Sequence, residues 1–80
     1  MQCLFVLLKC ELGRAYDVAD AAMQEIDAVS EVYSISGQYD LLMKVYLEDG
    51  DDIGRFVTQH MQTLDGVRDS FTLIAHKAFG

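Results

Sequence analysis

The stretch that decides the fold is VYSISGQYDLLMKVYL, residues Val32–Leu47. Two apolar segments meet in its middle at Gly37-Gln38-Tyr39-Asp40, which is the pattern of two strands joined by a turn. Gly37 has the backbone freedom that a chain reversal needs, and the Asp40 carboxylate can accept hydrogen bonds from nearby backbone amides. The stretch therefore predicts a β-hairpin with strands over Val32–Ser36 and Leu41–Glu48.

A predicted strand and a predicted helix precede this hairpin. Residues Gln2–Cys10 are apolar at nearly every position, which predicts a central strand buried on both faces. Residues Ala15–Ala28 predict an amphipathic helix, because apolar side chains recur there at helical spacing: Ala19, Ala22, Met23 and Ile26.

A second helix and a last strand follow the hairpin. The helix is predicted over Asp52–Thr63, begins at aspartates that can cap free amides, and ends before Gly66. Its apolar side is predicted to consist of Ile53, Phe56, Val57, His60, Met61 and Leu64. The last strand is predicted over Val67–Ala78, where Phe71, Leu73 and Ala75 alternate with Ser70, Thr72, Ile74 and His76.

The order strand, helix, strand, strand, helix, strand predicts an α+β fold, the ferredoxin-like βαββαβ sandwich, as one domain over residues 1–80. Both helices then cover one face of a four-stranded antiparallel sheet. Because the first and third strands are apolar on both faces, the other face needs a cover as well. We expect a homodimer in which two sheets pack against each other as a dimeric α/β barrel.

Composition supports this expectation and excludes other classes. A chain of 80 residues hides only about 60% of the surface that its unfolded form exposes. Yet 51% of the residues are hydrophobic. This composition favours a partner molecule that covers the apolar groups left exposed by a single chain. The formal charge of −7 argues against direct nucleic-acid binding. The N-terminal apolar run is too short to span a bilayer and lacks the features of a signal peptide, so we expect a cytoplasmic protein.

The two cysteines are expected to be reduced thiols. Cys3 and Cys10 lie on one predicted strand, about 23 Å apart, and a disulfide requires Cα atoms within about 7 Å. No nucleophile motif, phosphate-binding glycine loop or metal-ligand spacing is present, so we expect no enzyme activity, no cofactor and no metal. His60 is interpreted as a packing or boundary residue, and His76 as exposed to solvent.

Two groups of polar residues are the candidates for a site. Gly37, Tyr39 and Asp40 lie in the hairpin turn, and Ser70 and Thr72 lie on the last strand. They are explained equally well by turn chemistry and strand propensity or by a small-molecule site. In such a site the turn amides and the Asp40 carboxylate would hold the charged ends of a ligand, and the two hydroxyls would donate to it.

Two motifs give the chain a resemblance to a known family. These are Gly37-x-Tyr39-Asp40 and Gly66-Val67-x-x-Ser70-x-Thr72, and the similarity extends over essentially all 80 residues. The chain resembles the effector-binding domain of the Lrp/AsnC transcription regulators, also called the RAM (regulation of amino-acid metabolism) domain. The resemblance implies sheet-paired dimers assembled into rings, commonly octamers. It also implies an amino-acid effector between dimers, held by Gly37, Tyr39, Asp40, Ser70 and Thr72.

The chain departs from that family in two ways. Ser70 stands where the family often has Thr, which keeps the hydroxyl. The helix-turn-helix domain that precedes this module in full-length members is missing, so we expect either a stand-alone module, acting with full-length Lrp/AsnC regulators as partners, or a fragment. A small dimeric barrel enzyme of the cofactor-poor monooxygenase or isomerase kind remains an alternative, as does a pure oligomerisation scaffold. Asp40→Ala is expected to weaken effector binding and to leave the dimer folded.

Overall fold

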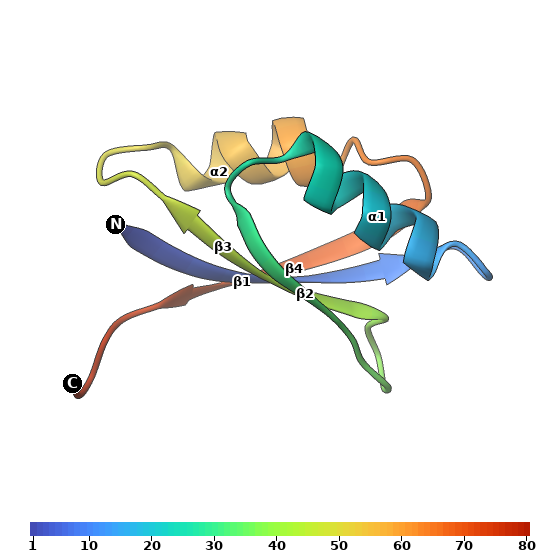
Figure 1. The fold of residues 1–80 in the computed structure, drawn as a ribbon, viewed down its shortest axis with the longest axis horizontal. Helices are drawn as coiled ribbons and strands as arrows, with labels where there is room; N and C mark the ends of the chain where they lie inside the picture. The colour runs from blue at the N-terminus through green and yellow to red at the C-terminus, as the bar shows by residue number, and fades with distance from the viewer.

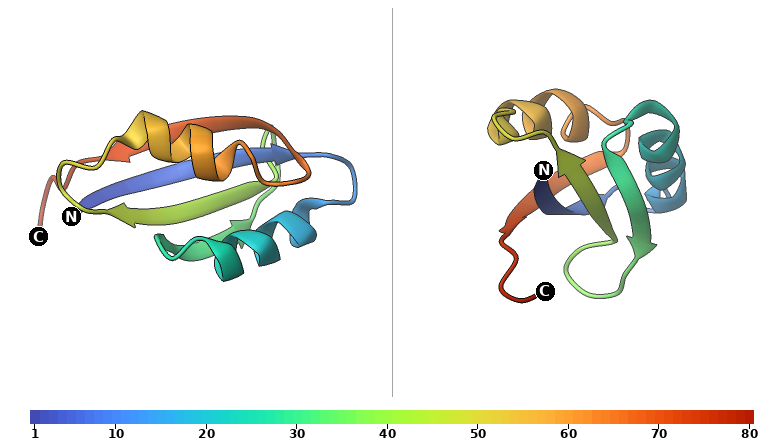
Figure 2. Two further views of the ribbon diagram at one scale, coloured as in Figure 1. Left: turned by 90° about the horizontal axis from the view of Figure 1, so that it is seen from above. Right: turned by 60° about the vertical axis from the view of Figure 1, so that its left-hand side comes forward.

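The structure is a computed structural model that describes all residues, 1–80. Its elements, in chain order, are β1 Gln2–Cys10, α1 Ala15–Glu25, β2 Val29–Ser34, β3 Leu41–Leu47, α2 Ile53–Phe56, the π-helical segment η1 Val57–Met61, and β4 Val67–Ala75. The strands form one antiparallel sheet in the order β2-β3-β1-β4. Both helices lie on one side of this sheet (Figures 1 and 2). The predicted ferredoxin-like fold is confirmed.

The core lies between the helices and the two central strands. Alternate residues of β1 and β3 point toward the helices and are buried: Leu4, Val6, Leu8 and Cys10 on β1, and Leu41, Met43, Val45 and Leu47 on β3. The helical layer adds Val18, Ala22 and Ile26 from the first helix region and Val57, Met61 and Leu64 from the second. No polar or charged side chain is buried, so hydrophobic contacts hold the two layers together.

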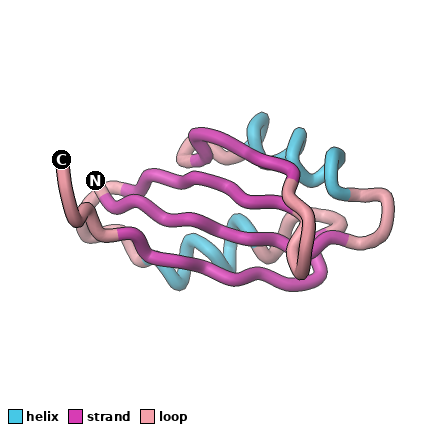
Figure 3. Tube along the Cα trace, turned by 90° about the horizontal axis from the view of Figure 1, so that it is seen from below, coloured by secondary structure: helices cyan, strands magenta, loops and turns pink.

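The opposite side of the sheet carries no helix (Figure 3). We call this side the open face; its apolar side chains are Cys3, Phe5, Leu7, Tyr33, Leu42, Tyr46, Phe71 and Leu73. The predicted central place of β1 is confirmed, because it pairs with both β3 and β4. Its second face is only half-buried in a single chain, and Phe71 and Leu73 on β4 are 50% and 44% exposed.

The region between α1 and β2 differs from the prediction. The helix was expected to reach Ala28 but ends at Glu25, because Ile26 has an extended backbone with φ −118° and ψ 100°. β2 begins at Val29 rather than at Val32, and a register shift between Val29 and Glu31 lets this polar segment pair with β3.

Further boundaries and positions were wrong by small amounts, among them the end of β3, which was expected at Glu48 and lies at Leu47. Met23, expected on the buried stripe of the first helix, is 49% exposed, whereas Val18 is fully buried in its place. β2 ends at Ser34 rather than Ser36, and β4 ends at Ala75 rather than Ala78. Past the end of β2, the Ile35 N–H still donates to the Asp40 carbonyl at 2.9 Å, but this bond belongs to the turn rather than to the strand pairing.

The second helix was predicted as one regular element and is two. The predicted cap is confirmed, since the Asp52 side chain accepts a hydrogen bond from the Arg55 N–H at 2.9 Å. After Phe56 the backbone widens into η1, where the Gln62 N–H donates to the Val57 carbonyl five residues earlier. This widening changes which side chains face the sheet, so His60 is exposed rather than on the apolar side. No helix here has the length and apolar character needed to cross a bilayer.

Candidate functional site

The hairpin turn is tied to the end of the central strand. Gly37 has φ 127°, a backbone conformation that other residues adopt at a cost, and its position faces open space. The Asp40 N–H donates to the Leu8 carbonyl at 2.9 Å, and the Asp40 carboxylate accepts from the Cys10 N–H at 2.8 Å. Asp40 was predicted to bond to backbone amides close to it in the chain, but its carboxylate bonds instead to an amide thirty positions earlier. The carboxylate therefore positions the turn against β1.

Tyr39 reaches from the turn to the far edge strand. Its ring stacks on that of Phe71, with centroids 6.1 Å apart and an interplanar angle of 17°. Lys9 also contacts the turn, because its Nζ donates a hydrogen bond to the Gln38 carbonyl at 3.3 Å. Tyr39, Gln38, Lys9 and Asp69 line a small hollow at this corner of the open face.

Ser70 and Thr72 lie on the other side of the sheet from Phe71. They pair in register with Leu8 and Val6, whose side chains point toward the helices. Ser70 Oγ accepts a hydrogen bond from Gln62 Nε2 at 2.9 Å. Within one chain, Tyr39 thus lies on the face of the sheet opposite to Ser70 and Thr72. Asp40 lies at the end of β1, bonded to the Cys10 backbone.

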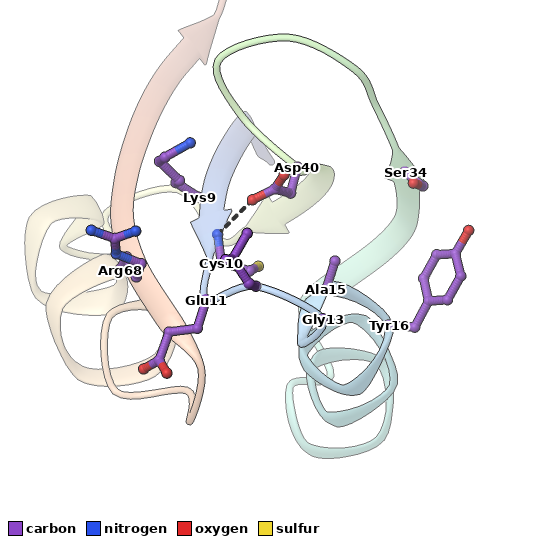
Figure 4. A pocket seen from close by; sticks show the side chains of 10 residues that line it. Lys9, Cys10, Glu11, Gly13, Ala15, Tyr16, Ser34, Asp40 and Arg68 are labelled. Atoms are coloured by element: carbon purple, nitrogen blue, oxygen red, sulfur yellow. Dashed lines mark hydrogen bonds between the residues drawn. The ribbon is translucent and has the colours of Figure 1, made fainter.

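A larger cavity of about 350 Å³ lies where β1 ends and α1 begins, and we call it the β1–α1 cavity. Ten residues line it: Lys9, Cys10, Glu11, Leu12, Gly13, Ala15, Tyr16, Ser34, Asp40 and Arg68. Figure 4 shows Lys9 and Arg68 on the β4 side, Tyr16 and Ser34 on the opposite side, and Asp40 and Cys10 between them. Of these, only Asp40 belonged to the predicted site.

The first turn of α1 faces the same cavity. Arg14, the residue before the helix, gives no side-chain cap, because a guanidinium has no acceptor for the helix N–H groups. It binds Asp17 and Asp65 instead, at 3.2 and 3.0 Å. The N–H groups of Ala15 and Tyr16 donate to no group of the chain. These two residues line the cavity, which leaves their free donors at its edge.

The thiol at the base of the cavity is held in its neutral form. Burial raises the pKa of Cys10 above its ordinary value of 9.0, and the negative charge of Asp40 raises that pKa further. Cys10 is only 5% exposed, and both cysteines are free thiols. Since a neutral, buried thiol is a poor nucleophile, Cys10 acts as an apolar wall.

The remaining titratable groups form no further site. No three of the histidine, cysteine and carboxylate side chains come together as ligands for a metal ion. His60 is exposed with its ring 5.3 Å from that of Phe56, and His76 is exposed beyond the end of β4. On the open face, Lys44 Nζ lies 5.4 Å from the centre of the Tyr46 ring, and interaction with Tyr46 raises the pKa of Lys44.

The sequence did not reveal that Arg68 lines the β1–α1 cavity. The register between β1 and β4 shifts between Lys9 and Cys10, since Lys9 pairs with Asp69 but Cys10 pairs with Val67. Arg68 is the extra residue of this bulge, which redirects its side chain. The only signal in the sequence was Gly66, and a glycine before a strand does not reveal where the register will shift.

Comparison with protein families decides the identity. The Lrp/AsnC ligand binding domain model matches residues 3–79, which is nearly the whole fold. The chain belongs to this family. The Lrp/AsnC domain described here is 29% identical over 73 residues to the HTH-type transcriptional regulator PH1916 of Pyrococcus horikoshii. That match covers 89% of the chain and 49% of the relative, so the chain spans about half the length of this relative.

Solved structures of other proteins share this fold. TTHA0845 from Thermus thermophilus is 36% identical, with a TM-score of 0.86, and the match covers 100% of this chain and 99% of that one. The transcriptional regulator NMB0573 of Neisseria meningitidis, solved in complex with L-Met, has a TM-score of 0.82 at 18% identity. That match covers 99% of this chain and 52% of that chain, and at this identity it shows a shared fold alone.

Proposed function

We propose that this Lrp/AsnC domain is a non-enzymatic, oligomeric module that binds a small effector, an amino acid, in the regulation of transcription. The family match over residues 3–79 supports the ligand-binding role. The relatives matched over most of the chain are transcriptional regulators, which supports the regulatory setting. The amino-acid class is supported by the resemblance described above and by the L-Met complex of a protein with this fold.

The observation that carries the proposal is the separation of the two groups of predicted site residues. The hairpin group, Gly37, Tyr39 and Asp40, lies apart from the hydroxyls of Ser70 and Thr72 within one chain. A site that uses both groups is therefore complete only where the turn of one chain meets β4 of another. Such an arrangement ties effector binding to assembly, because the ligand contacts more than one chain.

The open face supplies the first step of that assembly. It presents Phe5, Leu7, Phe71 and Leu73 without a covering layer, and exposed apolar surface of this kind marks an interface. We propose that two chains pair through this face and that pairs of chains then meet at the effector site, as in a ring. Full-length Lrp/AsnC regulators are the proposed partners through which binding would reach DNA, since the acidic chain does not suit DNA itself.

A thermal-shift screen of the purified chain against the standard amino acids, with light scattering on the same samples, tests this proposal. An effector at a hundred times its dissociation constant adds about 2.7 kcal/mol to the free energy of unfolding. We expect one or a few amino acids to raise Tm and to change the assembly size. Thr72→Val should abolish the shift, and Thr58→Val, on the exposed side of η1, should leave it unchanged. A well-folded oligomer that responds to no amino acid would contradict the proposal and favour a scaffold.

A further inference from the structure

We infer that the β1–α1 cavity binds the carboxylate group of a small ligand, with Arg68 as its anchor. This inference does not depend on the proposed effector site between chains, because all the residues that carry it belong to one chain. The cavity is separate from the hollow beside Tyr39, and the two share Lys9 alone among their lining residues.

The charges at the cavity are the first support. The chain has 6 basic and 13 acidic residues, yet the only basic groups in salt bridges are Arg14 and the N-terminal amine. Arg68 and Lys9 share the lack of a salt bridge with Lys44, Arg55 and Lys77, and they differ from those three in lining one cavity. Of the two, Lys9 is engaged by the Gln38 carbonyl at 3.3 Å, so Arg68 supplies the free positive charge of the cavity on this acidic molecule.

The carboxylates beside the cavity do not neutralise this site. The Asp40 carboxylate is engaged by the Cys10 N–H at 2.8 Å and belongs to the turn. Glu11 is exposed, lies on the loop that leaves β1 and makes no salt bridge with Arg68. Cys10 adds no charge, because burial keeps its thiol neutral. An incoming carboxylate would thus be the first anion to pair with Arg68.

The backbone of β4 positions the side chain of Arg68. The bulge between β1 and β4 places Arg68 out of the alternation of its strand, and its side chain lines the cavity. An arginine can hold a carboxylate through two parallel N–H···O bonds, which a lysine cannot. Across the cavity, Tyr16 and Ser34 offer hydroxyls for a second polar group of the ligand. The space of about 350 Å³ suits a molecule of metabolite size.

The test is a titration of the isotope-labelled 80-residue chain followed by NMR. The probes are succinate, L-glutamate and inorganic phosphate, each added at constant ionic strength. We expect saturable shifts of the Gly13, Ala15 and Tyr16 amides and of the Arg68 side-chain N–H with at least one carboxylate probe. Arg68→Gln should weaken that binding by about tenfold or more, as loss of a charge-assisted bidentate contact does.

Arg55→Gln is the matched control, because Arg55 is also an arginine without a salt bridge but lies on α2, outside the cavity. It should leave the dissociation constant unchanged. Equal weakening by both variants would mean attraction by overall charge and would overturn the inference, as would an absence of saturable shifts with every probe. Saturation by phosphate alone would overturn the assignment to carboxylates. Shifts confined to Tyr39, Ser70 and Thr72 would support the effector site and overturn this one.

Discussion

The Asp40 carboxylate lies 2.8 Å from the backbone nitrogen of Cys10 and accepts its hydrogen bond. The contact joins the β2–β3 turn to Cys10, the last residue of β1, after which the chain leaves the sheet. It gives Asp40 a structural role between distant segments, which the sequence did not indicate, because the turn carboxylate was expected to bond only to amides close to it or to a ligand. Asp40→Ala is therefore expected to affect stability as well as effector binding.

Asp40→Ala should now lower the free energy of unfolding by about 1–3 kcal/mol, because it leaves the part-buried Cys10 N–H without its acceptor. Asp40→Asn keeps an acceptor oxygen at the same distance along the side chain and should cost less than Asp40→Ala. Urea unfolding followed by circular dichroism measures both. If the two variants were equally stable, the hydrogen bond would not be the source of the effect.

Gly66→Ala should destabilise the chain more than Gly37→Ala. Both glycines have positive φ, 98° and 127°, so both substitutions introduce backbone strain. A Cβ on Gly66 would also lie 3.0 Å from Val18 Cγ2, inside the packed core, whereas one on Gly37 meets nothing within 4 Å. We expect the difference in unfolding free energy to be about 1 kcal/mol or more. Equal losses in urea unfolding would show that Val18 moves aside.

Stability should fall as the pH rises above about 9, in part through Cys10. Burial and Asp40 raise the folded-state pKa of this thiol above 9.0, so between the unfolded and folded pKa values the folded chain holds the proton more tightly. The contribution is complete below the unfolded pKa and declines as the pH passes through that window. Cys10→Ala should show a shallower fall in unfolding free energy between neutral and alkaline pH. Parallel curves for the two proteins would contradict this account.

Leu73→Glu should reduce the assembly to smaller species without unfolding it. Leu73 lies on the open face, in register with Phe5, and a charge there opposes pairing of two sheets. Ile74→Glu is a close control, because Ile74 is the next residue on the same strand, 52% exposed, and points to the other side. Light scattering after size-exclusion chromatography should show a lower mass for Leu73→Glu alone. An unchanged mass for both would place the interface elsewhere.

The sheet could be read from the sequence because its signals are local and agree with one another. The apolar run of β1, the turn at Gly37 and the alternation in β3 each predict a strand, and together they specify the fold. The start of β2 was missed because Ser30 and Glu31 are polar and pair only with the help of a bulge. Irregular pairing depends on the partner strand, which a local pattern does not contain.

The candidate site was predicted less well, because its geometry depends on contacts between distant segments. The turn residues were found from their sequence, but the Asp40–Cys10 contact and the Tyr39–Phe71 stack join positions about thirty residues apart. Arg68 was not predicted as a site residue, because its place in the cavity lining depends on the bulge between β1 and β4. Gln62 was missed for a similar reason, as the π-helical widening that ends beside it has no clear sequence signal.

The strand order has a consequence for how the chain folds as it is made. β1 is synthesised first and lies in the centre of the sheet, yet one of its partners, β4, is the last element of the domain. The backbone N–H and C=O groups along that edge of β1 remain unpaired until residues 67–75 have left the ribosome. This delay makes β1 the segment most exposed to wrong pairing during synthesis, and the segment for which chaperone binding would matter most.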